Sequence, residues 1–347
     1  RTAGRSGPGR APATLEQMTG WWNSIVAGDF DGDGRLDLVA GNWGRNTVHQ
    51  HFLAEPLELY YSEPGVGSGM GIGLVEAHTD PGLRQVVPAR DWGALKTVFP
   101  ALQDKFPNFT AFSTASLPEL QAAGLPRMRK LTAAMLDSVL LLNRGDHFDA
   151  APLPLEAQIS PVFGLAVGDL DGDGAEDIFL AQNFFGVSSA ESRSDAGCGV
   201  WLRGDGHGQF RAVPPRESGI SIPEEGRGAA LCDFDQDGRL DLAVGQNHGP
   251  TKLYRNRTAQ PGLRVRLQGP AENPNAIGAV VRVIFTGGTM GPAHEIRAGG
   301  GYWSQDSSDV VLGTPTSVEG ILIRWPGGSS EVVAIAPGSR SITHKRP

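Results

Sequence analysis

Short apolar runs separated by glycine, asparagine and aspartate dominate the hydrophobic pattern of this chain. Three of them are Leu38–Ala40, Ile178–Leu180 and Leu242–Val244, each preceded by an aspartate and followed within three residues by Gly or Asn. Runs of this length, ended by turn residues, are typical of buried β-strands. The pattern therefore predicts a mainly β protein built from short strands.

A different hydrophobic pattern interrupts the predicted strands over about residues 88–138. Helix-forming runs appear at 92–99, 116–123 and 128–139. Apolar residues of the last run recur at every fourth position: Leu131, Met135 and Val139. That spacing places them on one helix face, so we expect a small helical insertion that extends to the next strand.

The aspartate-rich segments repeat one pattern three times, with aspartate at positions one, three, five and nine and glycine at position six. The aspartates are Asp29, Asp31, Asp33 and Asp37, then Asp169, Asp171, Asp173 and Asp177, then Asp233, Asp235, Asp237 and Asp241. Four carboxylates in nine residues repel one another unless a cation lies among them, and such oxygen ligands favour calcium. A backbone carbonyl ligand is expected at position seven, which is Arg35, Ala175 or Arg239. Three calcium sites are therefore predicted, the alternative being acidic turns without metal.

These loops differ from the helix-flanked calcium loop, which needs a bidentate glutamate at position twelve. Position twelve is Ala40, Leu180 or Val244, and each lies within an apolar run. Each loop is therefore expected to join two strands.

A fourth copy of the loop has lost its aspartates. When Gly73-Leu74-Val75 is aligned with Asp37-Leu38-Val39, the four aspartate positions become Gly65, Gly67, Gly69 and Gly73. We expect this loop to bind no ion, whether it is an eroded repeat or an unrelated glycine-rich loop.

The three intact loops resemble those of FG-GAP (VCBS) calcium-binding propeller repeats. A second signature of that family recurs at 139–148, at 200–210 and, in part, at 252–256. The resemblance implies a partial β-propeller over residues 1–260, truncated at its N-terminus and carrying the helical insertion.

From residue 261 onward the chain resembles the ASPIC/UnbV domain, which closes bacterial FG-GAP proteins and animal cartilage acidic proteins. The resemblance rests on segments such as Asn273-Pro274, the run Gly299-Gly-Gly-Tyr302-Trp303-Ser304-Gln305 and Trp325-Pro326-Gly-Gly328. Short β-rich runs between Gly and Pro predict a small antiparallel sheet or sandwich over 261–347.

The net charge of the chain limits the class of molecule that is expected to bind it. The chain has 30 Lys and Arg against 38 Asp and Glu, a net charge of −8 that argues against nucleic acid. No apolar run is long enough to cross a membrane. Calcium chemistry and the family resemblance together imply an extracellular, periplasmic or cell-surface protein. Cys198 and Cys232 could pair or remain as small thiols.

A ligand surface is expected on the blade face opposite the calcium loops. The second loop of each repeat lies there and offers amides, aromatic rings and histidines: Asn42, Trp43, His78, Asn183, Phe184, Asn247 and His248. Such a surface fits a protein or glycan ligand, the alternative being that these residues shape turns and cover blade edges.

Three functions remain open at this point. The first is a secreted calcium-binding module for a protein or glycan. The second is an extracellular enzyme similar to polysaccharide lyases, with His78, His248 or Glu76 as candidate base, although no residue is assigned as catalytic. The third is an architectural subunit of a surface assembly.

Overall fold

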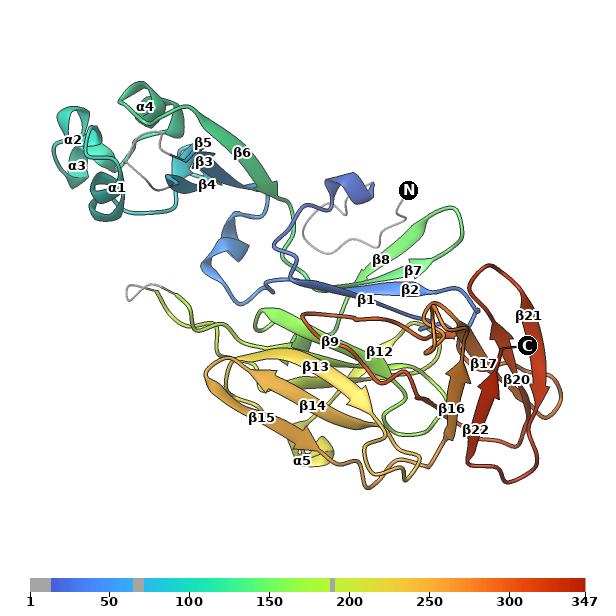
Figure 1. Cartoon of the computed structure of the whole chain (residues 1–347). Helices are drawn as coiled ribbons and strands as arrows, with labels where there is room; N and C mark the ends of the chain where they lie inside the picture. Colours follow the sequence, from blue (N-terminus) through green and yellow to red (C-terminus); the bar gives the residue numbers. More distant parts are fainter. Residues whose placement is uncertain (1–13, 65–71, 188–190, 347) are drawn as a thin grey trace. The chain divides into compact units, whose positions relative to one another are not determined.

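The described part of the chain divides into two compact units. The computed structural model describes residues 14–64, 72–187 and 191–346 (Figure 1). Of the described residues, one unit comprises those within 22–46 and 137–346, and the other comprises those within 14–21 and 47–136. In sequence, the larger segment of the second unit, Thr47–Leu136, is thus inserted between strands β2 (Asp37–Gly41) and β7 (Val139–Asn143) of the first.

The first unit begins with antiparallel sheets that share one plan, which we call blades 1 to 3. Blade 1 has the order β1-β2-β7-β8, with β1 Ser24–Gly28 and β8 Phe148–Pro152. Blade 2 contains β9 Val162–Gly168, β10 Asp177–Gln182, β11 Val200–Gly204 and β12 Phe210–Val213 in sequential order. Blade 3 contains β13 Gly226–Cys232, β14 Asp241–Gln246 and β15 Gly249–Tyr254. Each aspartate-rich loop joins the first two strands of its blade, and the mainly β prediction is confirmed.

Burial between blades explains why the strand after each loop is a continuous apolar run. The first strands of neighbouring blades pack together, β1 against β9 and β9 against β13. Every residue of β10 is buried, because one of its faces meets the apolar cluster shared with blade 1 and the other meets that shared with blade 3. A strand with both faces covered needs no polar alternation.

The C-terminal domain, from residue 261, packs as two sheets around its own core, which contains Trp325. One sheet has the order β19-β16-β22, with β16 Leu263–Gln268, β19 Val310–Leu312 and β22 Ser341–Lys345. The other has the order β18-β17-β20-β21, with β17 Val280–Phe285, β18 His294–Glu295, β20 Val318–Arg324 and β21 Ser330–Ala334. The expected antiparallel arrangement holds except that β22 runs parallel to β16.

The inserted unit combines a sheet with short helices. The sheet has the order β5-β4-β3-β6, with β3 Leu57–Ser62, β4 Leu74–Asp80, β5 Gln85–Pro88 and β6 Met128–Ala133. The helices are α1 Trp92–Val98, α2 Leu102–Lys105, α3 Phe109–Phe112 and α4 Leu117–Ala122. Asp91 caps α1, and Ser116 and Glu119 form a capping box on α4, so both of those predicted helices are confirmed.

The helix expected over 128–139 is wrong. Residues 128–133 form β6, which pairs with β3 along its whole length, and Val139 begins β7 in blade 1. Leu131 is 55% exposed, so the four-residue spacing marked no buried helix face. Pairing with β3 outweighs the weak local helix preference of this segment.

The glycine-rich loop lies in a hairpin but not in a blade. Strands β3 and β4 pair antiparallel on either side of it, and the amide of Gly73 donates to the Ser62 hydroxyl at 2.9 Å. In the blades the strand before the loop is at the sheet edge, whereas β3 lies between β4 and β6. Gly65, Gly67 and Gly69 fall outside the described residues, so the absence of an ion there stays a prediction.

Remaining described elements are short. They are the 3-10 turns η1 Leu15–Gln17, η2 Val48–Phe52 and η3 Leu155–Ala157, and helix α5 Pro215–Ser218. Cys198 and Cys232 are free, partly buried thiols. Among the described helices, none has the length and apolar character needed to span a membrane.

Candidate metal centres and ligand face

The three aspartate-rich loops, which we number 1 (29–37), 2 (169–177) and 3 (233–241), share a backbone fold that explains their glycine at position six. Gly34, Gly174 and Gly238 have φ of 89°, 91° and 83°, a left-handed conformation that side chains rarely adopt. This turn aims each glycine amide at the position-one aspartate, where it donates to Oδ2. The N–O distances are 2.9 Å to Asp29, 2.7 Å to Asp169 and 3.1 Å to Asp233. The spacing in the sequence is therefore a requirement of loop geometry.

The closing aspartates fasten each loop to its blade. Asp37, Asp177 and Asp241 are at most 1% exposed. Each accepts a backbone amide from position two at 2.9–3.0 Å through Oδ2 and a second backbone amide at 2.7–2.8 Å through Oδ1. The second amide belongs to Asn143 at the end of β7, to Gly204 at the end of β11 and to Asn256, two residues after β15. Position nine thus has a structural role that the sequence pattern did not reveal.

Carboxylate oxygens converge in every loop. Among the described residues, three groups have ligand atoms within 4.8 Å of one another: Asp29, Asp31 and Asp33; Asp169, Asp171 and Asp177; and Asp233, Asp235 and Asp241. Buried Oδ1 atoms of Asp29, Asp31 and Asp233 have no hydrogen-bond partner among residues 14–64, 72–187 and 191–346. A buried oxygen without a donor is unfavourable, and a hard cation would satisfy it. The residues of the loops therefore fit a bound calcium ion.

Burial makes these carboxylates hard to ionise without a cation. It raises the pKa of Asp37 to about 6 and that of Asp169 to about 7, although backbone amides partly oppose the shift. Burial also raises the pKa of Asp177 well above its usual range. These groups would be most stable as anions next to a metal ion.

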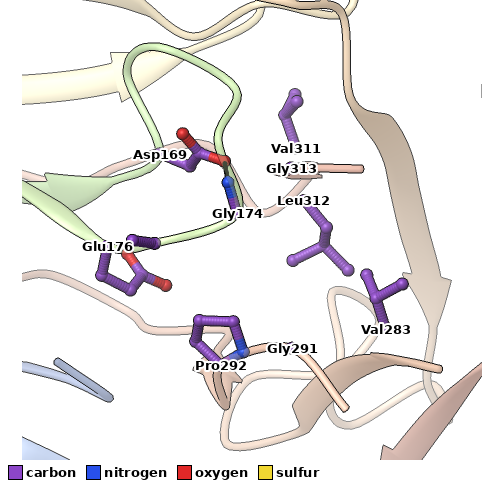
Figure 2. A pocket seen from close by; sticks show the side chains of 10 residues that line it. Asp169, Gly174, Glu176, Val283, Gly291, Pro292, Val311, Leu312 and Gly313 are labelled. Carbon is purple, nitrogen blue, oxygen red and sulfur yellow. Dashed lines mark hydrogen bonds between the residues drawn. The ribbon is translucent and has the colours of Figure 1, made fainter. Parts of the chain in front are cut away.

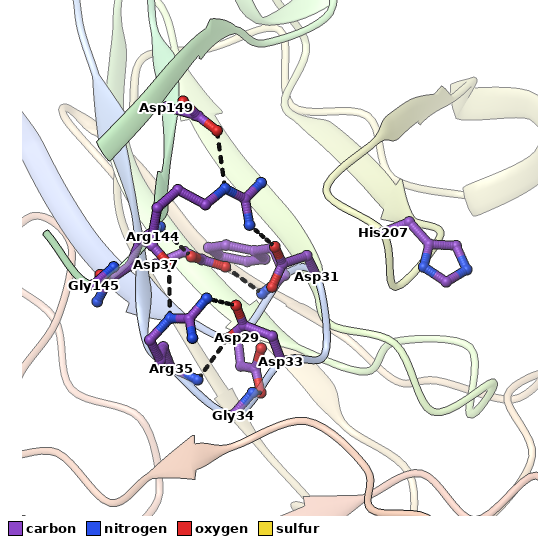
Figure 3. A network of polar contacts seen from close by, with 12 residues as sticks. Asp29, Asp31, Asp33, Gly34, Arg35, Asp37, Arg144, Gly145, Asp149 and His207 are labelled. Atoms are coloured by element: carbon purple, nitrogen blue, oxygen red, sulfur yellow. Dashed lines mark hydrogen bonds and ion pairs between the residues drawn. The ribbon is translucent and has the colours of Figure 1, made fainter. Parts of the chain in front are cut away.

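An arginine meets the position-three aspartate of every loop, a feature that sequence reasoning missed. In loop 1, Arg144 pairs with Asp31 and lies 2.9 Å from Asp149 (Figure 3). Arg203 pairs with Asp171 in loop 2, and Arg255 pairs with Asp235 in loop 3. All three arginines lie at the end of the third strand of their blade or at the residue after it. This shared position is the only sequence signal that could have predicted the contact. The protein itself therefore neutralises part of the charge that we had assigned to a cation alone.

Replacing Arg203 by glutamine is expected to strengthen calcium binding at loop 2. Arg203 competes with a cation for Asp171 and Asp173, but its side chain is 40% exposed and its charge is screened. We expect a two- to tenfold gain in affinity, about 0.4–1.4 kcal/mol, by calorimetric titration. Arg216→Gln on α5, an exposed residue beyond the end of β12 that is farther from the loop, makes the same charge change and should leave affinity unaltered. Equal affinities of the two variants would contradict the competition.

The C-terminal domain packs directly on aspartate-rich loops 1 and 2. The amide of Ala293 donates to Asp29 Oδ2 at 2.7 Å, and Arg282 Nη2 donates to the carbonyl of Gly32 at 3.3 Å. Next to loop 2, His294 Nδ1 lies 3.0 Å from Glu176 Oε1. A cavity of about 20 Å³, large enough for one water molecule, is lined by loop 2 and by residues such as Pro292 and Gly313 (Figure 2). Position-one carboxylates in loops 1 and 2 are thus covered by another domain.

The second loops of the three blades meet at the opposite end. Trp43 of blade 1 contacts Phe184 of blade 2, with ring centroids 5.2 Å apart. Glu225 of blade 3 accepts the amide of Phe185 at 2.8 Å and the side-chain amide of Asn247 at 2.7 Å. Trp43 and Phe184 are half-buried, and Asn247 and His248 are exposed. These residues therefore gather into one surface despite their separation in sequence.

The other expected ligand residues have different surroundings. Asn42 and Asn183 are completely buried, and the Asn183 side chain bonds to Ser160, Gly197 and neighbouring carbonyls. Both asparagines shape their loops from within. His78 belongs to the inserted unit, where its ring stacks on Phe52 at 3.7 Å.

Glu225 is unsuited to proton transfer. Burial acts to raise its pKa, but hydrogen bonds from Phe185 and Asn247 and the adjacent Arg227 outweigh that effect and lower the pKa. A carboxylate held as an anion by several donors is a poor general acid or base at neutral pH.

Comparison with known proteins supports both parts of the sequence interpretation. Residues 21–47 match the FG-GAP repeat family, and residues 269–347 match the family described as ASPIC and UnbV. The chain carries an FG-GAP repeat around loop 1 and an ASPIC and UnbV domain at its C-terminal end.

Cartilage acidic protein 1 from three animals is weakly similar. Identity is 30% over 125 residues with the Mus musculus protein, 27% over 103 with the Xenopus tropicalis protein and 27% over 124 with the Homo sapiens protein. The matched regions are 35%, 30% and 35% of this chain but only 17%, 14% and 16% of those proteins. The chain therefore spans a small part of the relatives it matches.

Proposed function

We propose that this protein is a secreted calcium-binding module that recognises a protein or glycan through the second-loop face of its blades. The observation that carries the proposal is the contact of Trp43 with Phe184 between the second loops of blades 1 and 2, together with the bond from Phe185 to Glu225 at the start of blade 3. Aromatic side chains with a few fixed polar groups are typical of recognition surfaces. Extracellular placement is supported by the similarity to cartilage acidic protein 1.

Calcium has a supporting role in this proposal. The ligands would be the aspartates at positions one, three, five and nine, with the carbonyls of Arg35, Ala175 and Arg239. Bound calcium would supply positive charge that holds each loop closed, and the loops in turn fix the ends of the strands that carry the opposite face. The ion takes no part in chemistry on a ligand.

Stabilisation by calcium should weaken as the pH falls. A raised pKa means that the folded, metal-free protein keeps protons that the unfolded chain loses between about pH 4 and 7, so its stability decreases as pH rises through that window. Calcium binds only the deprotonated carboxylates. For each carboxylate, the stabilisation by calcium therefore falls by about 1.4 kcal/mol for every pH unit below the pKa of that group. Melting temperatures with calcium and with chelator should differ more at pH 8 than at pH 5.5. A difference that is independent of pH would contradict this assignment.

Substituting the aromatic residues tests the ligand face. Trp43→Ala and Phe184→Ala should each weaken binding by about 1–3 kcal/mol, because buried aromatic anchors carry much of the free energy of an interface. The ligand would first be found by screening the full chain, with calcium, against a glycan array and a panel of secreted proteins.

Calcium stoichiometry is the control in that experiment. Both variants should bind as many ions as the parent, since neither residue lies in a metal loop. Loss of folding would assign the rings to the blade core instead. Turnover of an acidic polysaccharide would favour the enzyme alternative.

A further inference from the structure

An arm of the C-terminal domain, residues 297–307, runs along the innermost strands of the blades (Figure 1, orange-red). At the metal-loop end, Arg297 donates to the carbonyl of Ala27, and Ser307 N donates to Leu231 O at 3.0 Å. Farther along, Ser304 Oγ accepts the amide of Ala229 at 3.0 Å. The arm thus covers the open edge of β13 and carries its tip toward the second-loop face.

Aromatic rings connect the tip of the arm to that face. Trp303 lies 6.4 Å from Tyr302, Tyr302 lies 5.4 Å from Phe163, and Phe163 lies 6.1 Å from Phe184, all between ring centroids. Phe184 in turn contacts Trp43. All of these separations are within the range of aromatic pairs. Rings from blade 1, blade 2 and the C-terminal domain therefore form one continuous series.

Trp303 is the end of this series and projects into solvent. It is 92% exposed, and its φ of 50° places a bulky residue in the left-handed region. Such a backbone conformation persists only where surrounding contacts fix it, and it is frequent at binding sites. Here Gly300 N donates to Ser304 O at 3.1 Å across the turn. A large ring is thus held outward on a fixed turn, although burying it would favour folding.

The charge of Arg227, which lies against one of the rings, is already balanced. Arg227 lies over the Phe163 ring at 3.9 Å, pairs with Glu225 and donates to the carbonyls of Asn183 and Gly226 at 2.8 and 3.0 Å. A guanidinium with these partners offers little to an anionic ligand. The exposed groups at this end of blade 3, Asn247 and His248, have side chains that form hydrogen bonds.

We propose that Trp303 anchors a neutral saccharide at the tip of the arm, an inference that rests on the proposed function of this face. A pyranose ring has a face of C–H groups, which packs against the electron-rich face of an indole. Its hydroxyls need neutral donors and acceptors at the rim. A protruding, fully accessible ring suits stacking on a sugar, whereas a peptide anchor would enter a pocket. The C-terminal domain would therefore contribute to the ligand site rather than only closing the fold.

Affinity electrophoresis of the full chain tests this site. Native gels with calcium would contain a soluble β-glucan, a xylan or a galactomannan, with chondroitin sulfate as the acidic comparison. At least one neutral polysaccharide should retard the protein, and Trp303→Ala should weaken that retardation about tenfold or more. Trp303→Phe should keep part of it. Val332→Ala, at a residue 65% exposed on β21 of the same domain, should leave it unchanged.

The remaining outcomes test the role of Trp303 and the proposed function separately. Retardation that Trp303→Ala does not alter overturns the role of Trp303 but leaves ligand binding by the face intact. Retardation only by chondroitin sulfate, or binding only to a protein in the screen, overturns the neutral saccharide while supporting a binding module. Retardation in none of the gels overturns the inference, and the screen then decides separately on the function. The melting temperature of each variant with calcium shows that it is folded.

Discussion

Removal of calcium is expected to lower the free energy of unfolding by about 2.7 kcal/mol for each loop that had been held at a hundred times its dissociation constant. The reason is the set of buried carboxylate oxygens without hydrogen-bond partners, Oδ1 of Asp29, Asp31 and Asp233. Without a cation these atoms are desolvated and unpaired, and neighbouring carboxylates repel them. Arg144, Arg203 and Arg255 offset part of that repulsion, so the protein should be destabilised rather than unfolded outright.

Differential scanning calorimetry in calcium, and again after a chelator is added, measures this effect. Asp171→Ala should also reduce the number of bound ions by one in calorimetric titration. Asp146→Ala removes a carboxylate that is 89% exposed and outside the loops, so it should not change that number. Identical melting temperatures with and without chelator would sink the metal assignment.

Gly313→Ala is expected to disturb loop 2 from the C-terminal domain. A Cβ atom at Gly313 would lie 1.7 Å from Asp169 Oδ2 and 2.8 Å from the amide of Gly174, and these two atoms bond to each other. The added methyl group must displace either the Asp169 carboxylate or the C-terminal domain, which carries residue 313. Overpacking of this kind costs about 1–3 kcal/mol. We expect a lower melting temperature in calcium and a weakened or missing ion at loop 2 alone.

Gly245→Ala is the matched control, since its Cβ would meet nothing closer than 3.9 Å. Both variants remove one glycine, so they change the entropy of the unfolded chain similarly. If Gly313→Ala melts and binds calcium as the control does, the domain contact with loop 2 does not exist in solution.

The metal loops could be predicted from sequence because their chemistry is local. Aspartates at fixed spacing and a glycine that must adopt positive φ lie within nine residues, and the apolar run after each loop indicates a mostly buried strand. The strand-loop-strand unit and the caps of α1 and α4 are likewise set by neighbours in the chain.

The local sequence pattern did not predict the structure correctly where the strands that pair are far apart in the chain. Leu131 and Met135 have the spacing of a helix face. The segment that contains Leu131 nevertheless forms a strand, because it pairs with β3, which is far away in sequence. Loop 1 and β7 belong to one blade although the whole inserted unit separates them, because β2 pairs with β7. Sheet pairing is decided by the complete fold, and sequence spacing carries no record of it.

The sequence by itself determined the mainly β architecture, the three acidic loops, the C-terminal domain and the candidate aromatic residues of the second loops, because each depends on residues close together in the chain. Only the tertiary structure decided which of these residues meet. It buried Asn42 and Asn183, brought Trp43 against Phe184, laid Ala293 and Gly313 on the metal loops and carried Trp303 toward the opposite face. Contacts between residues more than a hundred positions apart arise from packing of whole blades and domains, and no short-range pattern encodes them.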